Sequence, residues 1–196
     1  MELQTIPLHS PLELTLELTD EQFFQLCTDN RDLRFERTAS GGLIIMPPTG
    51  SETGNFNIDL SYQLQSWSRQ NKHLGIAFDS STGFKLPDGT DISPDAAWIR
   101  RDRWDALTAE EKKKFAPICP DFVVELRSTT DSLEKLRAKM KVYVKNGARL
   151  GWLLDRKNRK VEISRQGSDV EILDSPATLS GEDVLPGFVL DLSDIL

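Results

Sequence analysis

Two long segments of the chain carry hydrophobic residues with a helical period. In residues 51–70 the apolar positions are spaced by four, four and three, which places them on one face: Phe56, Leu60, Leu64 and Trp67. Residues 131–146 carry a second apolar stripe, and Gly147 directly after them is typical of a helix end. A shorter helix is expected over residues 19–30, where Thr19 is a suitable N-cap.

Short apolar runs bounded by Gly, Pro, Asn or Asp predict the strands. The expected strands span residues 33–37, 43–46, 75–78, 82–85, 95–100, 121–127, 150–154, 160–164, 170–173 and 188–190, and a further short helix is expected over 108–115. Residues 121–127, the helix after them and residues 150–154 form a strand–helix–strand unit, whose two strands should be parallel. The sequence therefore predicts an α/β fold, with a central mixed β-sheet flanked by helices.

The length of the chain suits one domain. Its 196 residues allow one sizeable core. We expect a single domain over residues 1–196, with 1–32 as an N-terminal extension and 175–196 as a C-terminal tail. No apolar run approaches the roughly 20 residues that span a bilayer, and Met1–Pro11 lacks the basic start and apolar stretch of a signal peptide. A cytoplasmic protein with no membrane partner is therefore expected.

Cysteine and histidine are scarce, which narrows the kinds of site. The cysteines, Cys27 and Cys119, lie far apart and outside any CxxC pattern, and the only histidines are His9 and His73. A zinc site and a histidine-based triad are thus not expected. The net charge of −7 argues mildly against a nucleic-acid partner, although a local basic stripe can bind phosphate on an acidic protein. Any chemistry must rest mainly on carboxylates and a basic residue.

One carboxylate interrupts an apolar strand. Glu125 lies within the run Phe-Val-Val-Glu-Leu, and strand alternation places Val123, Glu125 and Arg127 on one face. A glutamate in such a strand should be partly buried, which is costly unless it is paired or bound to a metal ion. An ion pair between Glu125 and Arg127, or between Glu125 and a lysine, is the alternative to a metal site.

Two further carboxylates suggest a shared site with Glu125. Asp95 opens the strand over residues 95–100, and Glu52 lies at the start of the helix over 51–70. A turn or capping role explains Asp95 equally well by itself, and the helix dipole explains Glu52. Two carboxylates from adjacent strands and one from a packed helix are, however, suited to hold Mg²⁺, a hard ion that prefers oxygen ligands.

Four sequence motifs resemble those of a known family. They are Met46-Pro47-Pro48-Thr49-Gly50; Ser93-Pro94-Asp95; Pro120-Asp121-Phe122-Val123-Val124-Glu125-Leu126-Arg127-Ser128; and Asn146-Gly147-Ala148-Arg149-Leu150-Gly151-Trp152-Leu153-Leu154-Asp155. Pro94-Asp95 followed by Glu125-Leu126-Arg127 resembles the PD-(D/E)XK nuclease signature. The flanking residues resemble a large bacterial family within that superfamily, grouped as restriction endonucleases and formerly a family of unknown function. The resemblance covers residues 33 to 172.

The resemblance implies a restriction-endonuclease-like core and Mg²⁺-dependent cleavage of DNA, with Mn²⁺ as a substitute. In that superfamily Asp95 and Glu125 would bind the metal ion, together with the backbone carbonyl of Leu126. Glu52 would match a glutamate on the first long helix that often joins the site. A homodimer is also expected, because cutting two strands suits two-fold symmetry.

The chain departs from the signature at its lysine position, which is Arg127. Arginine stays charged and cannot act as a general base, although it can stabilise charge on a phosphate. Lys139, beside the apolar stripe of the following helix, is the preferred candidate for the missing lysine, with Lys141 on the other flank. The leading hypothesis is a metal-dependent endonuclease that hydrolyses DNA phosphodiester bonds with Asp95, Glu125 and either Arg127 or Lys139. The alternative is a catalytically inactive nuclease-fold domain that binds nucleic acid or a protein partner.

Overall fold

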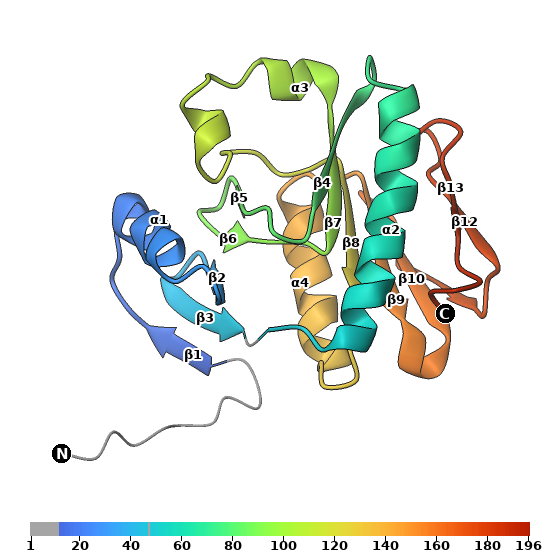
Figure 1. Cartoon of the computed structure of the whole chain (residues 1–196), viewed down its shortest axis with the longest axis horizontal. Coiled ribbons are helices and arrows are strands. Elements are labelled where there is room, and N and C mark those ends of the chain that lie inside the picture. Colours follow the sequence, from blue (N-terminus) through green and yellow to red (C-terminus); the bar gives the residue numbers. More distant parts are fainter. Residues whose placement is uncertain (1–11, 47) are drawn as a thin grey trace.

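The structure, a computed structural model, describes residues 12–46 and 48–196 (Figure 1). The interpretations made above for Met1–Pro11 and for Pro47 lie outside the described residues. The helices are α1 (Asp20–Asp29), α2 (Ser51–Gln70), α3 (Arg101–Asp105) and α4 (Leu133–Lys145), with single 3-10 turns at Glu111–Lys113 and Arg156–Asn158. The three helices predicted from hydrophobic period and capping are confirmed as α1, α2 and α4, and Thr19 caps α1 in a capping box.

A six-stranded mixed sheet forms the centre of the molecule. Its strands, in spatial order, are β11 (Glu171–Asp174), β10 (Lys160–Arg165), β9 (Leu150–Asp155), β8 (Phe122–Leu126), β7 (Ala96–Arg100) and β4 (Gly75–Asp79). The neighbours β8 and β9 are parallel, as predicted for strands joined through α4, and the other pairs are antiparallel. The predicted α/β class with a central mixed sheet is therefore confirmed.

Two smaller sheets accompany the central one. The first contains β1 (Leu12–Thr15), β3 (Gly42–Met46), β2 (Arg34–Arg37), β6 (Asp91–Ile92) and β5 (Phe84–Lys85), in that spatial order. The second is the hairpin of β12 (Thr178–Ser180) and β13 (Val189–Asp191). The strands expected over residues 33–37 and 43–46 are confirmed as the antiparallel pair β2–β3.

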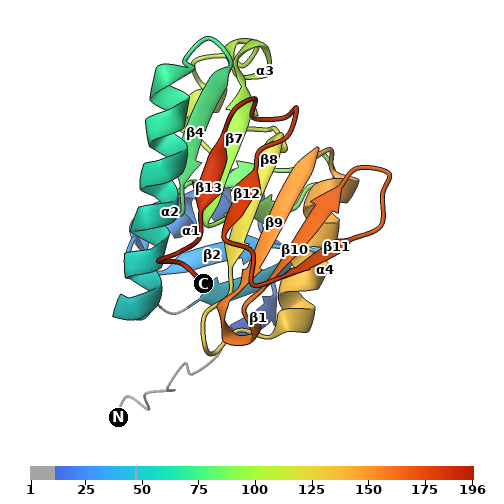
Figure 2. The ribbon, with the colours of Figure 1, turned by 90° about the vertical axis from the view of Figure 1, so that its right-hand side faces the viewer.

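The elements pack in layers on the two faces of the central sheet. Helix α2 and the β12–β13 hairpin cover one face, and α4 with the five-stranded sheet lies on the other (Figures 1 and 2). Strand β8 contributes to both cores through its alternation: Phe122, Val124 and Leu126 pack on the α2 side, and Val123 packs on the α4 side. Glu125 thus points toward α4, into the space between the two sheets.

Two segments differ from the simplest expectation. The prediction of a helix over 108–115 was wrong, since α3 precedes that segment and only one 3-10 turn forms within it. Thr108 and Glu111 bond to each other as a capping box, but the lysines that follow supply no apolar face on which a helix could pack. Residues 175–196, expected as a tail, contribute to the core through side chains such as Phe188 and Leu190.

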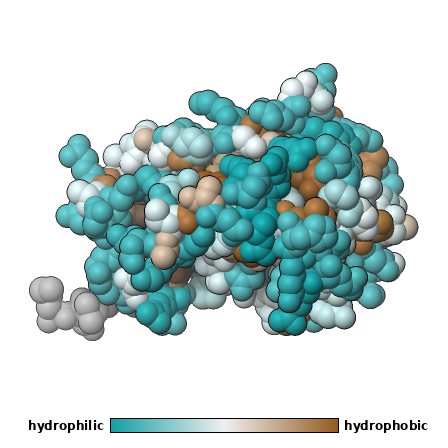
Figure 3. Space-filling model, turned by 90° about the horizontal axis from the view of Figure 1, so that it is seen from above, coloured by the Kyte–Doolittle hydropathy of each residue, from teal (hydrophilic) through white to brown (hydrophobic). Residues whose placement is uncertain are grey.

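Hydrophilic residues dominate the face of the molecule seen from the α3 end, where the hydrophobic areas are small and separated (Figure 3).

Among the helices within residues 12–46 and 48–196, none combines the length and apolar character that a membrane crossing requires.

Candidate functional site

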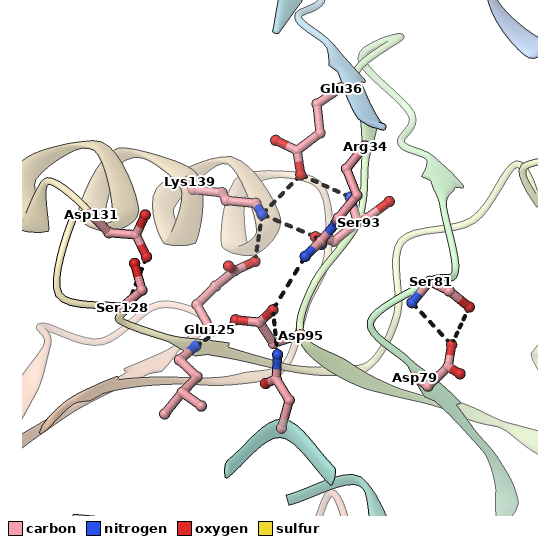
Figure 4. Close-up of polar contacts among 12 residues, drawn as sticks. Arg34, Glu36, Asp79, Ser81, Ser93, Asp95, Glu125, Ser128, Asp131 and Lys139 are labelled. Atoms are coloured by element: carbon pink, nitrogen blue, oxygen red, sulfur yellow. Dashed lines mark hydrogen bonds and ion pairs between the residues drawn. The ribbon is translucent and has the colours of Figure 1, made fainter. Parts of the chain in front are cut away.

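Charged side chains from four elements meet between the central sheet and the β2 strand. Asp95 directly precedes β7, Glu125 lies on β8, Lys139 comes from α4, and Glu36 lies on β2 (Figure 4). These four side chains are far apart in the sequence, and all except Lys139 belong to buried residues. Tertiary packing therefore collects three carboxylates around one ammonium group.

Asp95 is held by backbone groups of the neighbouring strand. Its N–H donates to the Val124 carbonyl at 3.0 Å, and its Oδ2 accepts from the Leu126 N–H at 2.8 Å. The contacts of the other oxygen, Oδ1, with described residues are long: 3.6 Å to Arg34 Nη1 and 3.5 Å to Asn57 Nδ2. One carboxylate oxygen thus fixes the side chain, while the other is available for a stronger partner.

Glu125 is almost completely buried, with 3% of its surface exposed. Its Oε1 accepts from Lys139 Nζ at 2.9 Å and from the Tyr143 hydroxyl at 2.9 Å. Burial raises the pKa of Glu125 to about 7, and the nearby Asp95 and Glu36 charges add to this against the opposing effect of Lys139. Among the described residues, the partners Lys139 and Tyr143 both meet Oε1, which leaves Oε2 as the candidate oxygen for a metal ion.

Lys139 is clamped by three oxygen acceptors. Its Nζ lies 2.9 Å from Glu36 Oε1, 2.9 Å from Glu125 Oε1 and 3.0 Å from the Ser93 carbonyl. Burial alone lowers the pKa of Lys139, but the charges of Glu125 and Glu36 outweigh it and hold the pKa above its usual value. The raised pKa keeps Lys139 protonated at neutral pH, which suits it to stabilise negative charge.

Two members of this cluster were missed in the sequence. Glu36 is buried on β2, where it also accepts from the Ser93 N–H at 3.1 Å. Its position inside the predicted strand Arg-Phe-Glu-Arg was an available signal, because a glutamate there shares a face with Arg34 and not with Phe35. Tyr143 lies within the apolar helix predicted over residues 131–146, and its hydroxyl donates to Glu125. Burial raises the pKa of Tyr143, which keeps it a proton donor.

Arg127 does not join this cluster. Strand β8 ends at Leu126, so the alternation that was expected to align Arg127 with Glu125 stops before it. The guanidinium instead donates to both Asp155 carboxylate oxygens, at 2.9 and 3.0 Å, and to the Asp131 carbonyl. Arg127 thus links the ends of β8 and β9, and its described partners do not include Glu125.

Glu52 is also placed elsewhere. Its side chain is 66% exposed and lies 3.8 Å from Arg156, whose guanidinium covers the Phe56 ring. Asn57, five residues farther along α2 and so roughly 140° around the helix, is the residue that approaches Asp95. The structure therefore brings Asp95, Glu125 and Lys139 together and leaves Glu52 and Arg127 outside.

The donor set at Asp95 and Glu125 fits a hard divalent cation. Asp95 Oδ1 and Glu125 Oε2 are carboxylate oxygens on adjacent strands, with weak contacts or none described. Within residues 12–46 and 48–196 no group of three or more His, Cys, Asp or Glu is arranged to hold a metal ion. Mg²⁺ does not require one, since it is commonly held by one or two carboxylates plus waters and substrate phosphate. The Leu126 carbonyl remains a predicted third ligand.

Comparisons with known proteins agree with this architecture. A family model described as "Uma2: Putative restriction endonuclease" matches residues 20–193. The fold is similar to that of a protein from Anabaena variabilis, described as "a putative nuclease belonging to DUF820", with a TM-score of 0.71, 20% identity, and coverage of 91% of this chain and 97% of that chain. No curated protein matches the chain. The predicted resemblance is confirmed: the chain belongs to the Uma2 family of restriction-endonuclease-like proteins.

Proposed function

We propose that this protein is a Mg²⁺-dependent endonuclease that hydrolyses phosphodiester bonds in DNA. The observation that supports the proposal most directly is the position of Asp95 and Glu125 on neighbouring parts of the sheet, beside the ammonium of Lys139. Two carboxylates and a cation at one place are the groups that metal-assisted hydrolysis of a phosphodiester needs.

The carboxylates provide the cation site. Asp95 Oδ1 and Glu125 Oε2 would hold Mg²⁺ or Mn²⁺, with Leu126 contributing its carbonyl. Such an ion lowers the pKa of a bound water and offsets charge on the phosphate. The Leu126 N–H and the Tyr143 hydroxyl hold the two carboxylates in place through their other oxygens. These hydrogen bonds restrict the rotamers of Asp95 and Glu125 before a metal ion binds, so less conformational entropy is lost on binding.

Lys139 takes the place of the signature lysine in this proposal. Its ammonium touches Glu125 and stays protonated, so its role is to stabilise negative charge that develops on the phosphate. Glu36 and the Ser93 carbonyl fix its position from the opposite side. Arg127, which is engaged by Asp155, is not needed for this role.

Plasmid nicking tests the proposal. The wild type with Mg²⁺ or Mn²⁺ should convert supercoiled DNA into nicked circles, and Asp95→Asn, Glu125→Gln and Lys139→Met should each abolish this. Glu162→Gln is the matched control, because Glu162 is another buried strand glutamate, and its described ion pair is with Arg137 and not with Lys139. Cleavage that survives both carboxylate substitutions would refute the proposal.

Calorimetric titration separates this proposal from the inactive alternative. The wild type should bind Mn²⁺, and Asp95→Asn should weaken that binding. A wild type that binds neither Mg²⁺ nor Mn²⁺ at millimolar concentrations would favour a nuclease-fold domain that only binds a partner.

A further inference from the structure

Arg34 is the second basic residue that faces Asp95. It lies two positions before Glu36 on β2, so strand alternation points both side chains into the same space. Figure 4 shows the guanidinium of Arg34 above Asp95 and next to Ser93. Its Nη2 donates to the Ser93 carbonyl at 3.2 Å, and its Nη1 lies 3.6 Å from Asp95 Oδ1.

The bonding capacity of Arg34 is only partly used. A guanidinium carries five N–H groups, yet the Asp95 contact is long and the buried Nε has no hydrogen-bond partner among the residues that the structure describes. The side chain is 30% exposed, so Arg34 borders the solvent from which a ligand would approach. Arg127 shows the contrast: it is 11% exposed and donates to Asp155 at 2.9 and 3.0 Å. Arg34 is therefore placed and available to receive an anion.

The charge balance of the cluster indicates which anion. Two cations, Arg34 and Lys139, face three carboxylates, Glu36, Asp95 and Glu125, which leaves one excess negative charge when all are ionised. A divalent cation would turn this into one excess positive charge. A phosphodiester carries a single negative charge and would complete the balance. Its paired oxygens also match the planar fork of a guanidinium.

We propose that Arg34 is a further catalytic residue, which binds the phosphodiester of duplex DNA that is cut beside Asp95. This inference rests on the proposed nuclease function. Glu36 and Lys139 form the inner part of the site, and Arg34 forms its solvent-facing wall. The amide of Asn57, on α2, also approaches Asp95 Oδ1, at 3.5 Å.

Salt dependence of DNA binding provides the test. The affinity of Arg34→Gln and Arg34→Lys for a labelled duplex of random sequence is measured by fluorescence anisotropy over a range of salt concentrations. Each series is run with Ca²⁺, a hard cation with oxygen ligands, and again with EDTA. Arg149→Gln is the matched control. Arg149 has a similar side-chain exposure of 34%, but it precedes β9 and pairs with Asp183, at the end of the sheet where β8 begins.

Loss of one phosphate contact has a defined signature. Arg34→Gln should bind DNA about tenfold more weakly or worse, and the slope of log affinity against log salt should shrink by about 0.9, the value for one duplex phosphate contact. Arg34→Lys should keep the wild-type slope, since its charge remains. Its affinity for DNA should be lower, because an ammonium lacks the planar fork of a guanidinium. Arg149→Gln should match the wild type in both quantities.

The two proposals fail in different ways. Equal slopes for the wild type and Arg34→Gln in both buffers would overturn the role of Arg34. Mn²⁺ binding by Arg34→Gln should equal or exceed that of the wild type, because a positive charge next to Asp95 is removed. A loss of Mn²⁺ binding would show that Arg34 only supports the carboxylates, which also overturns the inference. A wild type that binds no metal ion would refute the proposed nuclease function, whereas a slope difference in EDTA would still support the phosphate contact.

Discussion

Replacing Glu125 by a glutamine should make the metal-free protein more stable at alkaline pH. Burial raises the pKa of Glu125 to about 7 from an ordinary value of 4.5. The folded state therefore holds a proton on Glu125 more tightly than the unfolded state does. The contribution of this group to stability is complete below the unfolded pKa and is lost as the pH rises through the folded pKa. Glutamine is neutral like the protonated glutamate, so the stability contribution of this position should not fall as the pH rises.

The size of the effect follows from the two pKa values. One pKa unit corresponds to about 1.4 kcal/mol, so the rise at Glu125 corresponds to roughly 3 kcal/mol once the pH is well above 7. Between about pH 5.5 and about pH 8, the free energy of unfolding of Glu125→Gln should gain about 2 kcal/mol relative to the wild type. The amide oxygen of the substituted side chain would still accept from Lys139 and the Tyr143 hydroxyl, so the hydrogen bonds at this position are retained.

Urea unfolding in EDTA measures the difference. The buried Trp98 and Trp152 report loss of the native core by fluorescence. Glu162→Gln serves as the control, because it removes an ion pair with Arg137 and should lower stability at both pH values. A difference between Glu125→Gln and the wild type that does not change with pH, or a less stable variant at pH 8, would refute the reasoning.

The remaining predictions test the neighbouring interactions. Apparent Mn²⁺ affinity in calorimetry should rise with pH toward about 7 and then level off, because a proton competes for Glu125 below its raised pKa. Lys139→Met should cost about 3–5 kcal/mol in urea unfolding, since two buried carboxylates lose their cation. Arg127→Ala should also destabilise the fold, by about 3 kcal/mol, but should retain nicking activity per folded molecule; a selective loss of activity would return Arg127 to the site. Gly75→Ala should lower the melting temperature more than Gly151→Ala, because the new methyl group would lie 2.3 Å from a backbone oxygen in the first and 2.4 Å from the flexible end of a methionine in the second.

Stability and the proposed function oppose each other at Glu125. A buried carboxylate with a raised pKa destabilises the metal-free protein, and a bound cation would remove that cost. Buried carboxylates with shifted pKa values are common at functional sites, because the chemistry of such sites needs them. A Glu125→Gln variant that is more stable and inactive would be the expected expression of this conflict.

The sequence alone determined the elements whose cause is local. The period of hydrophobic residues predicted α2 and α4, and the capping preference of Thr19 predicted α1. Alternation in β8 correctly placed Glu125 on the face opposite Val124. These predictions succeed because backbone geometry repeats along each element, so neighbouring residues determine which face a side chain occupies.

Only the tertiary structure decided which cation meets which carboxylate. Arg127 and Lys139 were both candidates for the position next to Glu125, and the end of β8 together with Asp155 directs Arg127 away. Glu36 belongs to the cluster because the β2–β3 hairpin packs over the start of β7, which no local pattern encodes. Ion pairs form over a few ångströms between elements that are distant in the chain. The packing of the layers therefore determines which charged residues meet, and the hydrophobic period along one element does not.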